Sequence, residues 1–302
     1  MSQKTSLPAV SPQKIKSRML ALSMARRFVQ LAVLALFIGT VRLGWTLLGE
    51  PLLNGTLTSS LIAGSVPMSD PFALLQKLFA GHKPELTMVT GALIVLAIYV
   101  IAGGRAFCAW VCPMNIVTDA AYSARKSLNV PASSLRLSRH ARYALAAAAL
   151  LASAVSGTAA FEWVSPQAFL WRELIWGVGA GLIAAVTGVF ALDLLLLERG
   201  WCGHLCPLGA FWSVVGKVGV VKPIFDNDRC TKCGDCLRVC PEAHVLNFKL
   251  AAQRGFIASG ECTNCGRCAA VCPENAIRFA TRFQAKPQQN TMRATAEFTL
   301  LT

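Results

Sequence analysis

The sequence predicts a membrane protein, with an all-α domain of four transmembrane helices arranged as two two-helix repeats, followed by a small α+β domain folded around metal. Of its 302 residues, 54% are hydrophobic and only 15% charged, whereas about a quarter of an ordinary soluble domain is charged. The apolar residues form long uncharged runs, which are typical of membrane spans. All twelve cysteines fall into four short motifs, which indicates metal ligation in a reducing compartment.

The N-terminal segment 1–27 is predicted to be a basic cytoplasmic tail. It holds six basic residues and no acid, and an uncharged run begins at Phe28. A helix over 28–48 would be 21 residues long, about 31 Å, with Arg42 snorkelling toward the outer surface. A cleaved signal peptide is the alternative, but no small-x-small cleavage site follows the run.

Three cleaner spans are predicted at 86–104, 143–161 and 174–192, each with 19 consecutive uncharged residues. The loop 49–85 holds two lysines against three acids, whereas 105–142 holds six basic residues against one acid. Basic residues collect in cytoplasmic loops, so the first loop is predicted outside and both termini inside. The domain of 28–221 is therefore predicted to be a multi-pass membrane segment.

The polar segment 222–282 is predicted to form the small metal domain, with 283–302 as a tail that offers no core. Two runs in it have the form Cys-x2-Cys-x2-Cys-x3-Cys-Pro, which is the bacterial ferredoxin pattern for [4Fe–4S] clusters. The fourth cysteine of each run ligates the other cluster. The predicted ligands are Cys230, Cys233, Cys236 and Cys272 for one cluster, and Cys262, Cys265, Cys268 and Cys240 for the other. The alternative is a zinc module with Cys₄ sites. Such modules combine two short Cys-x2-Cys segments and do not use three cysteines of one run with a fourth from another.

A second motif, Arg-x-aromatic-Cys-x3-Cys-Pro, occurs at 105–113 and again, 94 residues later, at 199–207. This internal duplication predicts two repeats of the same orientation, which bring four thiols together at the inner surface. We expect the neighbouring arginine to lower the thiol pKa. A redox-active dithiol pair or an S₄ iron site is one interpretation, and simple packing of buried cysteines is the other. The four residues are Cys108, Cys112, Cys202 and Cys206.

These motifs and the four spans together resemble the NapH family, membrane ferredoxin-type quinol dehydrogenase components associated with periplasmic nitrate reductases. The similarity covers about residues 20–280. The Cys-x3-Cys-Pro pair is shared with related membrane iron–sulfur proteins such as NosR and CcoG. The resemblance implies oxidation of a membrane quinol and electron transfer toward a periplasmic reductase through a partner iron–sulfur protein, NapG.

Several functional alternatives remain open at this point. The electron-transfer interpretation competes with an iron–sulfur assembly, regulatory or metal-reducing accessory factor, and with a structural membrane anchor. Charge bias places the clusters in the cytoplasm while the implied acceptor is periplasmic, so electrons either return through the Cys-x3-Cys sites or the metal domain senses redox state. His82, His204 and Asp193 are weaker candidates for proton transfer. The excess of basic residues is explained by inner loops and does not indicate nucleic acid.

Overall fold

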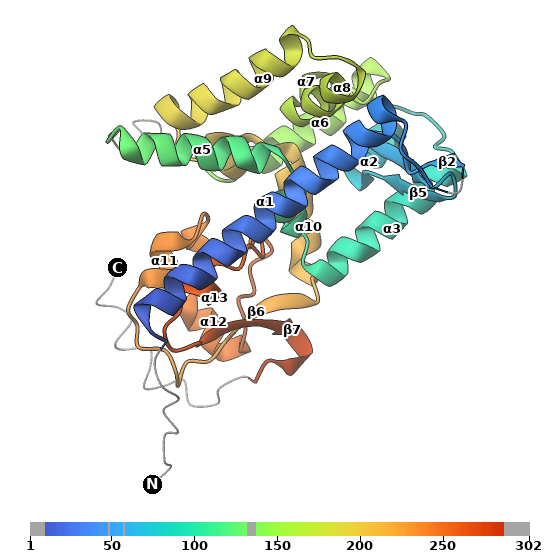
Figure 1. Cartoon of the computed structure of the whole chain (residues 1–302). Helices are drawn as coiled ribbons and strands as arrows, with labels where there is room; N and C mark the ends of the chain where they lie inside the picture. The colour runs from blue at the N-terminus through green and yellow to red at the C-terminus, as the bar shows by residue number, and fades with distance from the viewer. Residues whose placement is uncertain (1–9, 48, 57, 132–136, 287–302) are drawn as a thin grey trace. The chain divides into compact units, whose positions relative to one another are not determined.

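The structure, a computed structural model, describes residues 10–47, 49–56, 58–131 and 137–286. The chain divides into two compact units (Figure 1). We call 27–99 with 107–212 the helical unit, and the described parts of 1–26, 100–106 and 213–302 the cluster unit. Each is described by itself.

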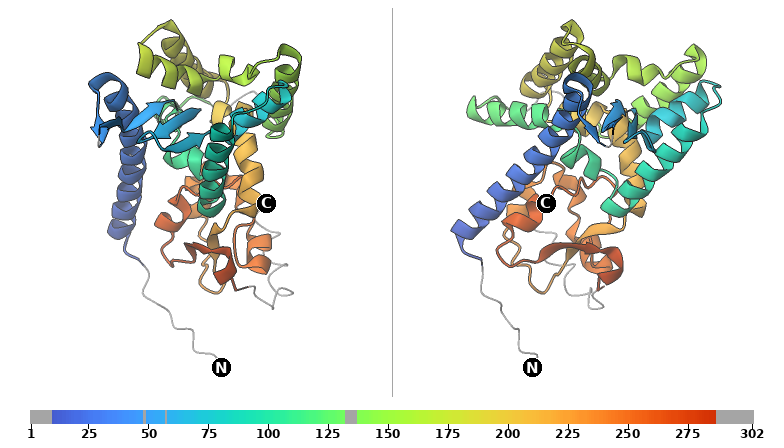
Figure 2. Two further views of the ribbon diagram at one scale, coloured as in Figure 1. Left: turned by 90° about the vertical axis from the view of Figure 1, so that its right-hand side faces the viewer. Right: turned by 45° about the vertical axis from the view of Figure 1, so that its right-hand side comes forward.

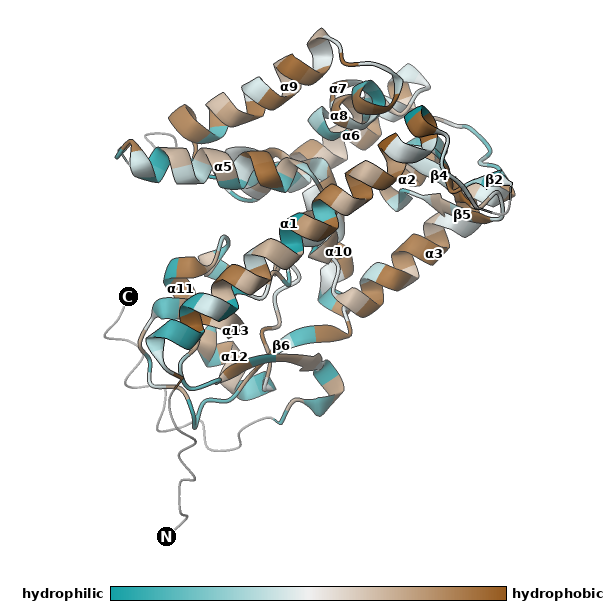
Figure 3. Cartoon of the chain, viewed as in Figure 1, coloured by the Kyte–Doolittle hydropathy of each residue, from teal (hydrophilic) through white to brown (hydrophobic). Residues whose placement is uncertain are grey.

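The helix α1 (Pro12–Leu43) is, among the described residues, the one helix that is long and apolar enough to cross a membrane. Its 32 residues correspond to about 48 Å. Figure 3 shows hydrophilic turns at its N-terminal end and mostly hydrophobic turns toward its C-terminal end. The segment predicted as a basic tail is therefore helical from Pro12 onward, because the basic residues up to Arg27 continue into the apolar run without a helix breaker.

The four predicted spans are not confirmed as four long helices. The first ends at Leu43, because Gly44 adopts a left-handed conformation (φ 66°) and a short strand follows. The third ends at Ser156 with Gly157 as a left-handed cap (φ 67°). The fourth is broken between Trp176 and Ala180, so its start at 174 is wrong.

Three of the helices are apolar but short, with 10–17 residues each. They are α3 (Leu86–Ala102), α6 (Ala141–Ser156), and α9 (Ala180–Ala191) continued by the π-turn η1 (Leu192–Leu196). In Figure 3, α3 and α9 are hydrophobic over most of their length.

The remaining helices of this region are shorter and connect the apolar ones. They are α2 (Pro71–Phe79), α4 (Ala106–Trp110), α5 (Met114–Ser127), α7 (Ala160–Val164), α8 (Pro166–Trp176), η2 (Trp201–Leu205) and α10 (Pro207–Val218), which continues into the cluster unit.

Residues 46–69 form antiparallel strands, which the sequence did not predict. A two-stranded ribbon pairs β1 (Thr46–Leu47) with β2 (Glu50–Pro51), and a three-stranded sheet has the order β3 (Leu53–Gly55), β4 (Ser59–Ile62), β5 (Val66–Ser69). Figure 2 shows the three-stranded sheet between the C-terminal end of α1 and α3. Leu53 packs with Phe37 of α1, and Gly91 of α3 approaches the β5 backbone so closely that a Cβ there would lie 3.0 Å from Pro67 C.

The cluster unit is built on an antiparallel pair of strands. In β6 (Val221–Phe225) and β7 (Ile277–Thr281), Val221 lies opposite Thr281 and Phe225 opposite Ile277. Between them come α11 (Asp235–Val239), η3 (Ala243–Val245), α12 (Phe248–Arg254) and α13 (Arg267–Val271), with η4 (Arg282–Gln284) after β7. The core consists of Phe225, Val245, Leu246, Ala251, Ala252, Ile257, Cys268 and Ile277.

Candidate functional site

The first ferredoxin run surrounds a cavity of about 620 Å³ in the cluster unit. Lys232 (φ 58°) and Gly234 (φ 79°) adopt left-handed conformations on either side of Cys233 and turn the chain sharply into α11. Cys272, the last cysteine of the second run, lines the same cavity, and its Sγ accepts a hydrogen bond from the Ala276 amide at 3.2 Å. The cysteines on this cavity are Cys230, Cys233, Cys236 and Cys272.

The second run repeats this backbone. Asn264 (φ 48°) and Gly266 (φ 81°) stand where Lys232 and Gly234 stand in the first run, and α13 follows as α11 does. The thiols of Cys262, Cys265 and Cys268 are close enough to act on one another electrostatically. The thiol of Cys240, from the first run, takes part in the same interactions. The first cavity thus brings Cys272 of the second run to three cysteines of the first, and Cys240 of the first run acts on thiols of the second. The assignment of ligands to the two clusters stays a prediction.

The chemistry of these thiols fits a polynuclear cluster. Burial first, and then neighbouring thiols, raise the pKa of Cys236 and Cys262 to about 11. Burial raises the pKa of Cys240 to about 12, and that of Cys268 well above the ordinary value. Grouped buried thiols ionise only beside positive charge, which the iron of a cluster supplies.

Two buried cations lie near the second run. Arg105 is 2% exposed, and its Nη1 donates to Glu242 Oε1 at 3.0 Å and to the Glu261 carbonyl at 3.0 Å. Lys222 is also 2% exposed and donates from Nζ to the carbonyl oxygens of Gly216 and Ser259. Both cations lower the pKa of Cys262, against the larger effect of burial. Sequence reasoning did not find Lys222 or Glu242, because neither belongs to a motif.

The four cysteines of the duplicated motif line one small cavity of about 20 Å³ in the helical unit. The first copy supplies Cys108 on α4 and Cys112 just after it, and the second supplies Cys202 in η2 and Cys206 at its end. Cys112 Sγ donates to Gln167 Oε1 at 3.6 Å. The predicted convergence of the two copies is therefore present, whereas the nature of the site stays open.

The expected effect of the neighbouring arginines is not observed at Cys112 and Cys202. Burial raises the pKa of Cys112 and Cys202 well above the ordinary value, nearby thiols raise it further, and no arginine is among the causes. The guanidinium groups point to carboxylates instead. Arg105 pairs with Glu242, and Arg199 pairs through Nη1 with Asp119 Oδ1 at 3.0 Å.

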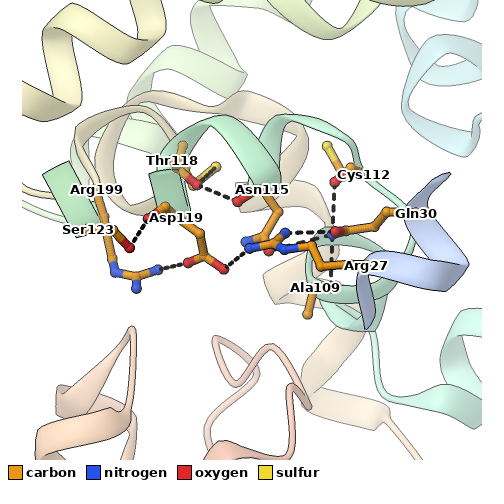
Figure 4. Close-up of polar contacts among 10 residues, drawn as sticks. Arg27, Gln30, Ala109, Cys112, Asn115, Thr118, Asp119, Ser123 and Arg199 are labelled. Atoms are coloured by element: carbon orange, nitrogen blue, oxygen red, sulfur yellow. Dashed lines mark hydrogen bonds and ion pairs between the residues drawn. The ribbon is translucent and has the colours of Figure 1, made fainter. Parts of the chain in front are cut away.

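Asp119 joins three parts of the helical unit (Figure 4). It lies on α5 and also accepts from Arg27 Nη2 at 2.6 Å, so two arginines bind one carboxylate. Beside it, the fully buried Gln30 of α1 donates to the carbonyl oxygens of Ala109 and Cys112 at 3.2 and 3.3 Å (Figure 4). These bonds fix the backbone that carries the first cysteine pair.

A larger cavity of about 270 Å³ adjoins the four cysteines inside the helical unit. Phe107, Ser165, Gln167 and Leu208 line both cavities. Most of the wall is aliphatic or aromatic, contributed by α1, the three-stranded sheet, α3, α7, α8 and α10. Two carboxylates, Asp70 and Glu162, also line it.

These two carboxylates are electrostatically unusual. Asp70 is the N-cap of α2 and accepts from the Phe72 amide at 2.9 Å, and Glu162 on α7 accepts from Thr58 Oγ1 at 2.9 Å. Burial, followed by the charge of Glu162, raises the pKa of Asp70 to about 7. Burial also raises the pKa of Glu162, although Thr58 and Arg172 act in the opposite direction. The sequence did not single them out because they are 92 residues apart, in segments without a motif.

The three weaker candidates for proton transfer, His82, Asp193 and His204, do not line the 270 Å³ cavity. His82 is exposed and its Nε2 lies 2.8 Å from the Gly157 carbonyl oxygen. Asp193 accepts from the Trp201 amide at 3.0 Å, which holds the turn between η1 and η2. His204 lies in η2, within the second cysteine pair, but does not line the cysteine cavity.

Family models match both cysteine regions. A 4Fe-4S dicluster domain matches residues 222–273, and a 4Fe-4S binding domain matches twice, at 85–131 and 178–225. The repeated match agrees with the internal duplication. No solved structure matches this chain.

Curated relatives match over most of the chain. The ferredoxin-type protein NapH of Escherichia coli (strain K12) is 41% identical over 223 residues, which is 73% of this chain and 75% of the relative. NapH of Haemophilus influenzae is 39% identical, over 85% of this chain and 89% of the relative. The methylamine utilization ferredoxin-type protein MauN of Methylorubrum extorquens is 43% identical, over 73% and 75%. This chain, a ferredoxin-type electron-transfer protein, therefore belongs to the NapH and MauN family.

Proposed function

We propose that this protein takes electrons from a membrane hydroquinone and passes them, through iron–sulfur centres held by its cysteines, toward a periplasmic reductase. The observation that carries the proposal is the shared wall between two cavities of the helical unit, one large and mostly apolar, the other lined by four cysteines. An apolar reductant can therefore bind next to a potential metal site. Iron–sulfur clusters accept and release single electrons when bound.

The cysteines would hold the centres as the sequence predicts. Cys230, Cys233, Cys236 and Cys272 would hold one cluster, and Cys240, Cys262, Cys265 and Cys268 the other. We propose a further iron or iron–sulfur site at Cys108, Cys112, Cys202 and Cys206. A 4Fe-4S binding model matches each copy of the motif once, at 85–131 and at 178–225, which supports this extra site.

We propose a multi-pass location in the bacterial inner membrane, with the cluster unit in the cytoplasm. Large apolar side chains are exposed on the helices concerned, among them Leu86 (78%) on α3, Val155 (89%) on α6 and Ile183 (60%) on α9. Exposed apolar surface of this kind favours contact with lipid. Three of these helices are shorter than a usual span, which local thinning of the bilayer or flanking residues can accommodate.

The relatives supply two candidate destinations for the electrons. Membership of the NapH and MauN family and the resemblance described for its motifs favour a nitrate reductase system, with a NapG-like iron–sulfur protein as the partner. MauN relatives are as similar as NapH relatives, so an electron acceptor of methylamine utilization is the second candidate.

The test is anaerobic stopped-flow reduction of the full chain, reconstituted in lipid nanodiscs, by menadiol, a tail-free naphthohydroquinone. We expect the visible absorbance of the clusters to bleach at a rate that saturates with menadiol. Protein that dithionite reduces but menadiol does not, even with the candidate partner proteins present, would contradict hydroquinone oxidation. The protein would then be better described as an accessory factor or an anchor.

A further inference from the structure

We propose that the 270 Å³ cavity of the helical unit binds the hydroquinone head group, and that Asp70 and Glu162 accept its two protons. The proposal deepens the proposed function and rests on it for the reaction, but the binding of a quinone in this cavity can be tested separately. Nothing in the family matches assigns residues to this site, and neither carboxylate lies within the segments matched by the family models.

The size and lining of the cavity select the class of ligand. Cavities that bind small molecules enclose roughly 300–1,000 Å³ and are mostly apolar with a few placed polar groups. At about 270 Å³ this one suits a head group of one or two rings, not a dinucleotide. Its walls include Phe37, Phe107, Phe161, Trp171 and Trp212, which offer faces for ring stacking.

Two hydrogen-bond donors in the wall have no partner within the described structure. Trp171 and Trp212 are 2% and 1% exposed, both line the cavity, and neither indole Nε1 has a hydrogen-bond acceptor among the described residues. An unsatisfied buried N–H costs about 1–3 kcal/mol. A ligand with carbonyl or hydroxyl oxygens, as a quinone has, would accept these bonds.

The carboxylates provide the proton acceptors. Oxidation of one hydroquinone breaks two O–H bonds and releases two protons and two electrons. The two protons would pass to the Asp70 and Glu162 carboxylates and then to water. An iron–sulfur centre held by the neighbouring Cys108, Cys112, Cys202 and Cys206 would supply the one-electron acceptor for the two electrons. Gln167 lines both cavities and contacts Cys112, so reductant and acceptor would be separated by one layer of side chains.

The pH dependence of this step follows from the groups around the cavity. In the described structure, the titratable or charged groups toward the carboxylates are Asp70 at the start of α2, Glu162 on α7, Arg172 on α8 and Tyr99 on α3, while β4 and β5 contribute the hydroxyls of Ser60 and Ser69. With its pKa raised to about 7, Asp70 accepts a proton above pH 7 and is already protonated below it. The rate of menadiol-driven reduction that uses Asp70 as the proton acceptor should therefore rise about tenfold from pH 6 to pH 8.

The binding experiment uses the full chain in nanodiscs and an azido-naphthoquinone as a photoaffinity probe, with peptide mapping by mass spectrometry. We expect label on segments that line the cavity, displaced by excess menadione. Ala168→Trp, which fills the cavity from α8, should abolish the labelling. The matched control is Phe169→Trp on the same helix, because Phe169 does not line the cavity. Label confined to other segments, or labelling unchanged by Ala168→Trp, would overturn the site.

The kinetic experiment separates the site from the proposed function. Asn at position 70 can still cap α2 and Gln at 162 can still accept from Thr58, so Asp70→Asn/Glu162→Gln should fold and bind the probe. We expect its menadiol-driven rate to fall at least 100-fold and the tenfold rise with pH to disappear. Glu85→Gln, an exposed carboxylate outside the cavity, is the control.

The outcomes distinguish the site from the proposed function. If menadiol reduces the wild type and the double variant equally well, the proposed function stands and the assignment of Asp70 and Glu162 as proton acceptors is wrong. If the wild type is not reduced while the probe labels the cavity, the binding site stands and the proposed function fails.

Discussion

Arg105 and Glu242 form a buried ion pair within the cluster unit, with Arg105 Nη1 3.0 Å from Glu242 Oε1, although 137 residues separate them in the chain. Their side chains are 2% and 7% exposed. The arginine belongs to the first copy of the duplicated motif, while its counterpart Arg199 pairs with Asp119 in the helical unit. The two copies thus keep the same residue for two different structural tasks.

Removing one partner of this pair should destabilise the cluster unit strongly. Arg105→Met removes the buried guanidinium from Glu242 and leaves the partly exposed His244, 3.6 Å from Glu242 Oε2, as a weaker partner. Breaking a buried ion pair in this way costs about 3–5 kcal/mol. We expect the midpoint of thermal loss of cluster absorbance to fall by several degrees, and Arg105→Met/Glu242→Met to recover much of the loss. The control is Arg238→Met, whose pair with Asp235 is exposed (77% and 40%) and should matter little. Equal effects of Arg105→Met and Arg238→Met would contradict the argument.

Lys222→Met should lower the reduction potential of the centre held by the second run. Burial lowers the pKa of the Lys222 ammonium, so the experiment is run at pH 6 to favour its charged form. A cation whose charge acts on Cys262 stabilises the more negative reduced state of the centre, and removing it disfavours reduction. An EPR-monitored redox titration measures the two centres in one sample. The centre at the cavity of the first run is the internal control, and a parallel shift of both centres would indicate a general change in the unit instead.

Asp70→Asn should stabilise the protein more at pH 8 than at pH 5. The folded-state pKa of Asp70 is raised to about 7 from 3.8, so folding disfavours the ionised form, and this penalty grows from pH 3.8 upward and levels off above pH 7. Asparagine removes the charge and keeps the cap of α2. Thermal unfolding in nanodiscs at the two pH values measures the gain. A gain of the same size at both, or a loss at pH 8, would show that burial does not penalise this carboxylate.

Cys108, Cys112, Cys202 and Cys206 should act as a unit. We expect serine at any one of them to abolish menadiol-driven reduction, and each single variant to resemble the quadruple variant, because residues that work together are non-additive. About eight irons and eight sulfides from the ferredoxin runs should remain in all of them. Cys236→Ala is the contrasting variant, since it should remove one of these clusters. Full activity of Cys108→Ser/Cys202→Ser would leave the four cysteines with a packing role.

Reporter fusions should place Ser69 on the periplasmic side of the membrane, and Val130 and Thr302 on the cytoplasmic side. The physical basis is the excess of basic residues in 105–142 over 49–85. Alkaline phosphatase activity at each fusion, compared with a cytoplasmic reporter at the same point, checks the orientation. A periplasmic C-terminus would contradict the multi-pass model with cytoplasmic clusters.

The sequence by itself determined the parts of this protein that depend on local spacing. Cysteines with two or three residues between them form a pattern that is visible without the fold, so the two ferredoxin runs and the duplicated Cys-x3-Cys pair could be predicted from the residues. The fourth predicted span begins at Ala180 instead of 174, because length and hydropathy do not register a helix break such as that at Gly177, where the chain leaves α8.

Only the tertiary structure decided which distant residues share a site. Asp70 and Glu162 are ordinary loop carboxylates in the sequence, and they acquire raised pKa values only where the sheet, α2 and α7 enclose them together. Likewise, the partners of Arg105 and Arg199 differ because each guanidinium binds the carboxylate that folding brings within reach. Burial and long-range proximity are properties of the packed chain, and no local pattern encodes them.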